Sequence, residues 1–300
     1  MNAIEIRNLS KSFRGLYALD GLNMTVPVGA IYGFIGENGS GKSTTEKLIC
    51  GHLVPDGGTI RLFGKDYTDP GVRVRVGALI ENPGCFPNSS VYMNLKMQAI
   101  NLNLPNPEVE IRRVLDIVRM ADSADIKFKS CSLGMKQRIG IAMALLGDPA
   151  LLILDEPING LDADGMRLMR EVLVDITKNY NCTVLISSHL LGELEKIATH
   201  YGIIRQGRMI VELSAAELEG RARVFVSLRV KDMHGAKAVL ERKYRDVRME
   251  EEGLRVYDVD DTESIVEYLL KNGHPVNRIE KNKIGLEEYY IELMSKKEGE

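Results

Sequence analysis

The chain has 300 residues, of which 44% are hydrophobic and 27% are charged, and these values indicate a globular protein with one large domain and a smaller one. The 39 basic and 42 acidic residues give a net charge of −3, so overall charge gives no support to sequence-independent binding of nucleic acid. No apolar run approaches the roughly 18 to 20 residues that span a bilayer, so a role at a membrane requires a partner.

The cysteines and the first residues of the chain indicate the cellular compartment of the protein. Cys50, Cys85, Cys131 and Cys182 form no C-x-x-C pair and show no metal-binding spacing, and the chain opens without a basic and then apolar leader. We therefore expect a reduced, cytosolic protein.

The N-terminal part predicts strands followed by a phosphate-binding loop. Residues 4–7 and 22–26 alternate with period two, as half-buried strands do, and residues 30–35 form an apolar segment. Residues 36–44 follow directly and fit the pattern G-x-x-x-x-G-K-[ST]. The ligand that this pattern predicts is a nucleoside triphosphate.

Each part of this loop has a physical role in holding phosphate. The glycines let the backbone bend around an anion with N–H groups pointing inward, and the helix expected near Lys42 adds the positive end of its dipole. Lys42 would reach the β- and γ-phosphates, and Ser43 would ligate Mg²⁺. The nucleotide-binding residues expected here are Gly36, Asn38, Gly39, Ser40, Gly41, Lys42, Ser43 and Thr44.

Residues 86–130 predict helices only. The first helix is expected to carry a stripe of regularly spaced side chains, namely Val91, Leu95, Gln98 and Leu102. Prolines in residues 105–107 break it, and the next helix has a stripe at i, i+3, i+4 and i+7, formed by Ile111, Val114, Leu115 and Val118. We therefore expect a helical subdomain inserted at about residues 86–146.

Two continuous apolar runs predict buried strands of a parallel sheet. They are residues 150–154 and 183–186, and continuous runs are typical of strands covered on both faces. The first run ends in Asp155 and Glu156, and ligands in such sheets collect at the carboxyl ends of strands. Asp155 is placed to hold Mg²⁺, and Glu156 is placed to orient and polarise an attacking water.

Residues 214–217 have capping-box spacing and open a short helix, which marks a domain boundary. Beyond residue 220 the chain predicts a separate small α+β unit without a catalytic constellation. Strands are expected at 224–230 and 254–257, helices at 236–244 and 265–270, and a further strand at 276–279. Residues 250–252 are expected to be a solvated turn.

With these motifs in order, residues 1–215 resemble the ATP-binding subunit of ATP-binding cassette (ABC) transporters. Residues 132–138 stand where that family carries its signature, commonly L-S-G-G-Q, and Ser132 would cap the helix that follows. The core-facing stripe expected on that helix is Ile139, Ala142, Met143 and Leu146. Residues 159–162, which end in Asp162, resemble the family's D-loop, and His189 resembles its switch histidine.

The resemblance implies an α/β P-loop NTPase fold with a helical subdomain, followed by a small C-terminal α+β domain at residues 221–300. It implies two ATP molecules, with Mg²⁺, sandwiched between two head-to-tail copies of this chain. Ser132 and Gly134 of one copy would face the γ-phosphate held by the other, and Asp162 would cross the interface. Phe13 stands where the family stacks an aromatic ring on adenine, and Tyr17 is the rival for that role.

Two positions depart from the family pattern. Glu81 replaces the usual Gln after the strand expected at 76–80, so a carboxylate would approach Mg²⁺ or water and form an acidic cluster with Asp155 and Glu156. Unless Mg²⁺ neutralises that cluster, one of the three acids should have a raised pKa. Leu133 and Met135 also replace residues of the signature, so its detailed contact with phosphate differs from the family pattern.

The departures resemble those in the branch of ABC ATPases linked to bacitracin resistance and lantibiotic self-protection. Residues 80–83, residues 132–138 and the tail at 285–290 carry this likeness. It implies an ATPase at the cytoplasmic face of the membrane that powers a separate exporting permease, docked near residues 81–90.

Three other interpretations remain open. A soluble ABC ATPase that acts on ribosomes or DNA is the main alternative, although neither a long coiled coil nor a second cassette is present. A P-loop kinase or GTPase would share only the first motif. Residues 221–300 are either a regulatory ligand-binding domain or a dimer-stabilising appendage.

Overall fold

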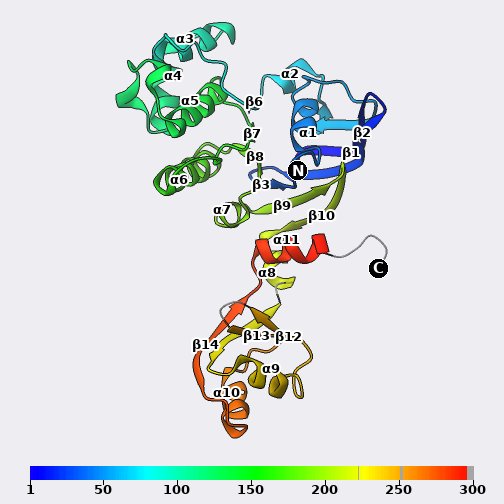
Figure 1. Ribbon diagram of the computed structural model, residues 1–300. Coiled ribbons are helices and arrows are strands. Elements are labelled where there is room, and N and C mark those ends of the chain that lie inside the picture. Colours follow the sequence, from blue (N-terminus) through cyan, green and yellow to red (C-terminus); the bar gives the residue numbers. More distant parts are fainter. Residues whose placement is uncertain (222, 251–252, 296–300) are drawn as a thin grey trace. The chain divides into compact units, whose positions relative to one another are not determined.

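The computed structural model describes residues 1–221, 223–250 and 253–295. These residues divide into two compact units, Met1–Ala215 and Ala216–Glu300, which are described separately (Figure 1).

A six-stranded sheet forms the centre of the first unit. Its order is β10-β9-β3-β8-β7-β6, and only β10 runs antiparallel to its neighbour. The strands are β3 (Ile31–Ile35), β6 (Val76–Leu79), β7 (Leu151–Asp155), β8 (Thr183–Ser188), β9 (His200–Arg205) and β10 (Arg208–Ser214). The two continuous apolar runs therefore lie side by side as β7 and β8 in a parallel sheet, as predicted.

A second, antiparallel sheet packs beside the first. Its order is β2-β1-β4-β5, with β1 (Asn2–Phe13), β2 (Leu16–Pro27), β4 (Gly57–Leu62) and β5 (Lys65–Asp66). Side chains from both sheets and from helix α1 (Lys42–Ile49) share one core, which includes Leu22, Phe34, Leu48 and Ile153. The alternating N-terminal strands were correctly predicted, but they are longer than the residues that showed the alternation.

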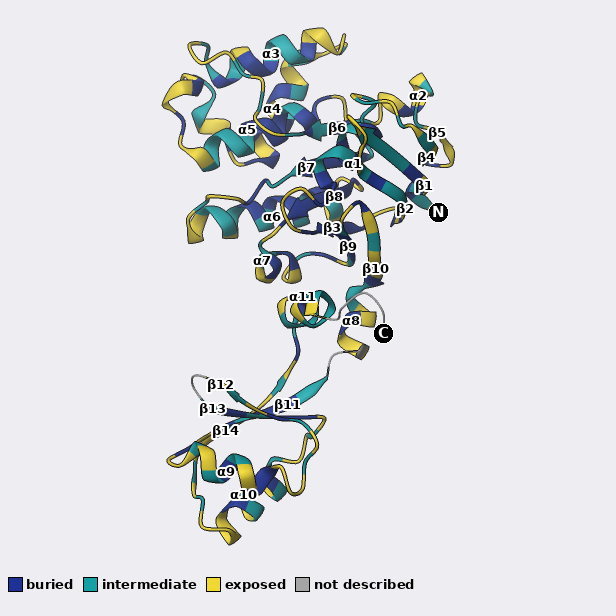
Figure 2. Cartoon of the chain, turned by 45° about the vertical axis from the view of Figure 1, so that its right-hand side comes forward, coloured by how far each residue is buried: buried dark blue, intermediate teal, exposed yellow. Residues whose placement is uncertain are grey.

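The other helices of the first unit lie beside its sheets (Figure 2). They are α2 (Pro70–Arg73), α3 (Val91–Asn101), α4 (Pro107–Ile117), α5 (Leu133–Leu145), α6 (Ala163–Asn179) and α7 (Leu191–Glu195), with short 3-10 turns at Ala121–Ser123 and Phe128–Ser130. The segment between β6 and β7 is helical apart from its loops, which confirms the predicted helical insertion. The stripe predicted on α4 is wholly buried.

The stripe of side chains predicted on α3 was wrong for its last residue, Leu102. Leu102 is 45% exposed, whereas Asn94 is 2% exposed and takes a place in the interior. The Asn94 side chain accepts a hydrogen bond from the backbone N–H of Phe86 and donates to the backbone oxygens of Phe86 and Ser90. A buried amide of this kind is stable because its polar atoms are paired, and it fixes the loop before α3.

The second unit follows a β-α-β-β-α-β order with a four-stranded antiparallel sheet. The sheet order β12-β13-β11-β14 is that of a ferredoxin-like fold. Its elements are α8 (Ala215–Arg221), β11 (Val224–Val230), α9 (Met233–Leu240), β12 (Val247–Glu250), β13 (Gly253–Tyr257), α10 (Thr262–Lys271), β14 (Val276–Lys283) and α11 (Leu286–Ser295). Apolar side chains of α9 and α10 pack against one face of the sheet.

The predicted strands β11, β13 and β14 and the predicted helices α9 and α10 are all present. The structure adds β12 and α11, which the sequence patterns did not indicate, and Glu250 ends β12 instead of lying in a turn. Residues 251 and 252, which complete that predicted turn, lie outside the described residues. Within the described ranges, no helix combines the length and apolar character needed to cross a membrane.

Candidate functional site

The loop after β3 has the geometry of a phosphate-binding loop. It joins Ile35 to the first residue of α1, Lys42, and Gly39 and Gly41 have φ angles of 80° and 112°. A Cβ at residue 41 would also lie 2.7 Å from the backbone oxygen of Ala18. Glycine is therefore required at this position by both backbone conformation and space.

The side chain of Lys42 turns back onto this loop. Its Nζ donates to the backbone oxygens of Gly36, at 2.6 Å, and Glu37, at 3.1 Å, and the residue is only 6% exposed. The ammonium group is thus held beside the loop that would surround a phosphate. Ser40 is also buried, and its hydroxyl has no hydrogen-bond partner among the described residues.

Ser43 and Asp155 meet at the ends of two distant segments. The Ser43 Oγ donates to Asp155 Oδ2 at 3.1 Å, and the Ser187 Oγ donates to Asp155 Oδ1 at 2.8 Å. Oxygen donors of this kind suit Mg²⁺, which is usually held by one or two protein groups together with phosphate and water. The donor set therefore fits the metal predicted from sequence, and the chain's own candidate ligands are Ser43 and Asp155.

Glu156 and His189 form a second pair at the same edge of the sheet. Oε2 of Glu156 lies 2.8 Å from Nδ1 of His189. Glu156 has a φ of 49°, and its backbone N–H donates to Ser187 Oγ at 3.1 Å. Because β7 and β8 are parallel neighbours, their carboxyl ends bring these side chains together, as the general rule for ligand sites in such sheets predicts.

A hollow of about 240 Å³ joins these groups, and we call it the phosphate hollow. Its lining residues are Ala18, Asn38, Gly39, Gly41, Lys42, Ser43, Thr44, Asp155 and Glu156. All but Ala18 were singled out from the sequence. The two aromatic candidates do not line it, because Phe13 and Tyr17 are 45% and 67% exposed on the β1–β2 hairpin.

The structure does not bring Glu81 to the phosphate hollow. Glu81 has a φ of 66°, and its Oε1 accepts a hydrogen bond from Lys47 Nζ at 2.7 Å. This contact, with the charge of Lys47, holds the pKa of Glu81 below its usual value. The expectation of a raised pKa therefore fails for Glu81.

The acid with a raised pKa is one that the sequence analysis did not single out. Glu46 on α1 is wholly buried, and neither of its carboxyl oxygens has a hydrogen-bond partner among the described residues. Burial, and then the negative charge of Asp155, raises the pKa of Glu46 well above its usual range. A glutamate on a helix gives no local signal of such burial, so only the tertiary structure reveals it.

Ser187 is the other functional candidate that sequence reasoning missed. Its hydroxyl contacts both Asp155 and the backbone of Glu156, so it ties the two acids to β8. A signal was present, because Ser187 stands near the carboxyl end of a buried strand, as Asp155 does.

The remaining predicted residues gather around a second hollow, of about 490 Å³, which we call the signature hollow. Ser132, Gly134 and Asp162 line it, together with Arg138 and Arg167. Ser132 Oγ accepts from the backbone N–H of Met135 and caps α5, as predicted, and Asp162 caps α6 in the same way. The two hollows share no lining residue, so they are separate places on the first unit.

Comparisons with known proteins show which family the chain resembles. A family model described as ABC transporter matches residues 19–159. The Bacitracin transport ATP-binding protein BcrA of Enterococcus faecalis is 36% identical over 296 residues, which cover 97% of this chain and 96% of that protein. The Lantibiotic transport ATP-binding protein SrtF of Streptococcus pyogenes is 39% identical over 209 residues, which cover 70% of this chain and 90% of that protein.

Solved structures show the same fold for the first unit. The cbiO1 protein from Clostridium perfringens, described as part of the ABC transporter complex cbiONQ, is 28% identical with a TM-score of 0.67, and the match covers 73% of this chain and 91% of that one. The ATP-binding cassette MJ0796, solved as a dimer bound to ADP and Pi, is 20% identical with a TM-score of 0.65 over 71% of this chain and 98% of that one, a likeness of fold alone.

Proposed function

Because the chain belongs to the ATP-binding subunits of ABC transporters, we propose that it powers a separate membrane permease that exports an antibiotic or antimicrobial peptide. It binds and hydrolyses ATP, as these subunits do. The export part of the proposal rests on relatives named for bacitracin and lantibiotic transport, the first of which matches nearly the whole chain. Residues 1–215 are then the ATPase domain, and residues 221–300 are an accessory domain.

One observation carries the catalytic assignment. The Oγ of Ser43 lies 3.1 Å from Oδ2 of Asp155. The Oε2 of Glu156, the residue after Asp155, lies 2.8 Å from Nδ1 of His189. A metal-holding pair and an oriented carboxylate thus stand beside a loop shaped for phosphate. This is the arrangement that phosphoryl transfer requires, because the reaction depends on positioning and on charge neutralisation.

ATP would bind with its phosphates in the loop at residues 36–44. Backbone N–H groups of the loop and the first turn of α1 would face the phosphate oxygens, and Lys42 would exchange its bonds to loop carbonyls for the β- and γ-phosphates. Ser43 and Asp155 would hold Mg²⁺. When bound, the metal neutralises charge on the β- and γ-phosphates.

Glu156 would orient and polarise the water that attacks the γ-phosphate. His189 fixes the Glu156 side chain from the neighbouring strand, and Ser187 fixes its backbone. The carboxylate is therefore held in one orientation before the water arrives, which is the condition under which general-base assistance is effective.

A second copy of this chain would complete each ATP site. The phosphate hollow and the signature hollow have no lining residue in common, and the signature hollow presents Ser132, Gly134 and Asp162. In a head-to-tail homodimer, the N-terminus of α5, capped by Ser132, would face the γ-phosphate held by the partner with the positive end of its dipole. Closure of the dimer would then require ATP.

The permease would dock in a groove between β6 and the helical insertion. Most residues that line the groove are apolar, including Leu79, Met143 and Leu146. Two of the lining residues, Val74 and Leu102, are exposed. Exposed apolar surface of this kind marks a protein contact. The loop at residues 81–90 borders it, so the chain would sit at the cytoplasmic face of the membrane through its permease.

Co-purification tests this proposal. The chain, expressed in its native membranes with an affinity tag, should be recovered with a multi-helix membrane protein, and cells that carry it should resist the exported antibiotic. Glu156→Gln should keep the complex and lose the resistance. Recovery with ribosomes or DNA and without a membrane protein would instead support the soluble ATPase alternative.

A further inference from the structure

One face of the second unit's sheet is not covered by α9 and α10. On β11 and β13 the alternate residues Val226, Leu228 and Val256 face those helices, so Phe225 and Tyr257 face the other way. The rings of Phe225 and Tyr257 lie 5.4 Å apart between centroids, and both residues are buried. We call this side of the sheet the arginine face, for the side chains that stand on it.

Three arginines stack on the two rings. The guanidinium carbons of Arg223 and Arg248 lie 5.0 and 4.4 Å from the centre of the Tyr257 ring, and that of Arg255 lies 4.8 Å from the centre of the Phe225 ring. Stacking of this kind holds a guanidinium group flat on the face and leaves its N–H groups free to point at anions.

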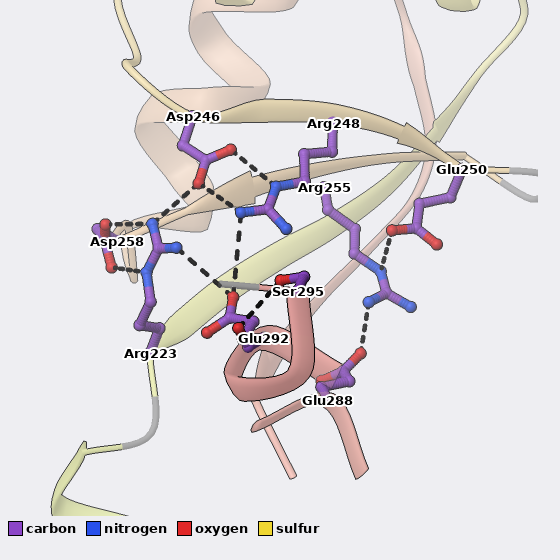
Figure 3. Close-up of polar contacts among 9 residues, drawn as sticks. All are labelled: Arg223, Asp246, Arg248, Glu250, Arg255, Asp258, Glu288, Glu292 and Ser295. Atoms are coloured by element: carbon purple, nitrogen blue, oxygen red, sulfur yellow. Dashed lines mark hydrogen bonds and ion pairs between the residues drawn. The ribbon is translucent and has the colours of Figure 1, made fainter. Parts of the chain in front are cut away.

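Two of these arginines are anchored from within the sheet. Arg223 pairs with Asp258 at 2.6 Å and with Asp246 at 3.0 Å, and Arg248 pairs with Asp246 at 3.0 Å (Figure 3). The same contacts hold the pKa values of Asp246 and Asp258 below their usual range. The cations therefore keep their positions without any contribution from α11.

Helix α11 lies on this face and presents carboxylates to the arginines. Glu288 accepts from Arg255 at 2.5 Å, and Glu292, one turn later, lies only within 3.8 to 3.9 Å of Arg223 and Arg248 (Figure 3). Tyr289 packs against the cluster that contains Phe225 and Tyr257. Helix α11 therefore contacts this face through Glu288, Tyr289 and Glu292.

The face continues beyond α11 as an open hollow of about 490 Å³. Its charged lining residues are Arg229, Glu250, Arg255, Arg278 and Glu280. Arg255 belongs both to this hollow and to the contact with Glu288, so the two parts are continuous. Arg278 pairs with Glu280 at 2.6 Å and Arg255 lies 3.7 Å from Glu250, so the charges of this hollow are paired within the sheet.

We propose that the arginine face is a binding surface for an acidic helix of a partner protein, and that α11 occupies it as an internal competitor. The chemistry of the occupant follows from α11 itself, which places two carboxylates one helical turn apart beside an aromatic ring. A partner helix that also reached the hollow would make contacts that α11 does not make. Release of α11 is feasible because its ion pairs are partly exposed and because Arg223 and Arg248 keep their aspartate partners.

A peptide of residues 285–295 provides the probe. Fluorescein-labelled, it should fail to bind the wild-type chain at micromolar concentration, because tethered α11 has an effective concentration on the order of millimolar. Glu288→Lys with Glu292→Lys should repel α11 from the arginines, lower the hydrogen-exchange protection of α11, and let the peptide bind at least tenfold more tightly than to wild type. The affinity should fall as salt rises.

The matched control carries the same change of charge on the opposite face. Glu263→Lys with Glu267→Lys alters two exposed acids of α10 and should leave peptide binding at the wild-type level. Peptide binding that is no tighter to the Glu288→Lys, Glu292→Lys chain than to wild type, despite lost protection of α11, overturns the proposal. Unchanged protection of α11 in that chain overturns it as well.

A charge swap separates release of α11 from unfolding of the unit. Loss of protection in β11 and β13 would mean that the whole unit had unfolded. The Glu288→Lys chain that also carries Arg255→Glu then decides, because the charges of the Arg255–Glu288 pair are exchanged and stay complementary. Recovered protection of α11 supports the proposal, and no recovery overturns it.

Discussion

Oε2 of Glu156 lies 2.8 Å from Nδ1 of His189, although 33 residues separate them in sequence. The two residues follow neighbouring parallel strands, so the pairing is a direct consequence of the sheet order. The carboxylate that the sequence assigns to water activation is thereby held by the imidazole of His189, and its backbone N–H is held by Ser187 of β8. Glu156 and His189 should consequently act as one unit in hydrolysis.

Glu156→Gln should lower the rate of ATP hydrolysis about 10²- to 10⁴-fold, because the amide cannot accept a proton. The affinity for ATP should change little, since the loop at residues 36–44 and Lys42 would hold the phosphates. Phosphate release and equilibrium nucleotide binding by the purified chain measure the two effects. Glu108→Gln, an exposed change on α4, is the matched control. Hydrolysis at the wild-type rate in Glu156→Gln would show that another group is the base.

His189→Ala should reduce hydrolysis through the position of Glu156. If His189 acts by holding that carboxylate, the double variant with Glu156→Gln should be about as slow as Glu156→Gln alone, because residues that act as a unit are not additive. Single-turnover hydrolysis of the two single variants and the double variant gives this cycle. Additive losses would mean that His189 has a separate contact with the nucleotide.

The parts of the site that were predictable share one property, which is that their signal is local. The phosphate loop, Asp155 and Glu156 are read from contiguous residues, and buried strands such as β7 appear as continuous apolar runs. Strand β12 gave no such signal, because only Val247 and Met249 are apolar in its four residues. Helix α11 was read as a motif and not as a helix, since its burial depends on a sheet face formed by distant strands.

The residues that escaped prediction are polar groups placed by tertiary structure. Asn94 is buried because a loop folds over it, and Glu46 is buried because α1 packs between two sheets. The place of Glu81 in the chain predicted a contact with the metal. In the structure its carboxylate instead accepts a hydrogen bond from Lys47 of α1. In each case the deciding contact joins residues that no periodicity connects.

Ser43→Ala should raise the Mg²⁺ concentration needed for half-maximal hydrolysis by about tenfold or more, because one of the two protein oxygens proposed to hold the metal is lost. Binding of ATP measured without metal should change little. The Ser43→Thr chain keeps the hydroxyl and is the matched control, so its dependence on Mg²⁺ should resemble wild type. Equal Mg²⁺ dependence in the Ala and Thr chains would remove Ser43 from the metal site.

Glu81→Gln and Lys47→Gln should have the same effect, because each breaks the one ion pair between α1 and the loop after β6. The pair is largely exposed, so folding stability should hardly change. Nucleotide affinity and basal hydrolysis should stay near wild type, while stimulation of hydrolysis by the permease should change. The ratio of permease-stimulated to basal hydrolysis is measurable in reconstituted vesicles, with Lys96→Gln as a control. An effect of Glu81→Gln alone would instead support the metal or water contact expected from sequence.

Glu46→Gln should stabilise the first unit at neutral and alkaline pH. Burial raises the pKa of Glu46 well above that of the unfolded chain, so the folded state holds a proton that the unfolded state releases. The stability tied to this proton is complete below the unfolded pKa of about 4.3 and is lost as pH rises toward the folded pKa. The Gln side chain has nearly the same shape and no proton to lose, so its advantage over wild type should grow as pH rises.

Thermal unfolding at several pH values tests this directly. The difference in Tm between Glu46→Gln and wild type should widen from pH 5.5 to pH 8.5, by a few degrees for a unit of this size, as about 1 kcal/mol shifts Tm by about 2–4 °C. Glu108→Gln removes an exposed carboxylate from the same unit, and its difference from wild type should stay level across this range. If the difference in Tm between Glu46→Gln and wild type also stays constant across this pH range, the buried carboxyl is ionised at neutral pH, with a compensating charge beside it.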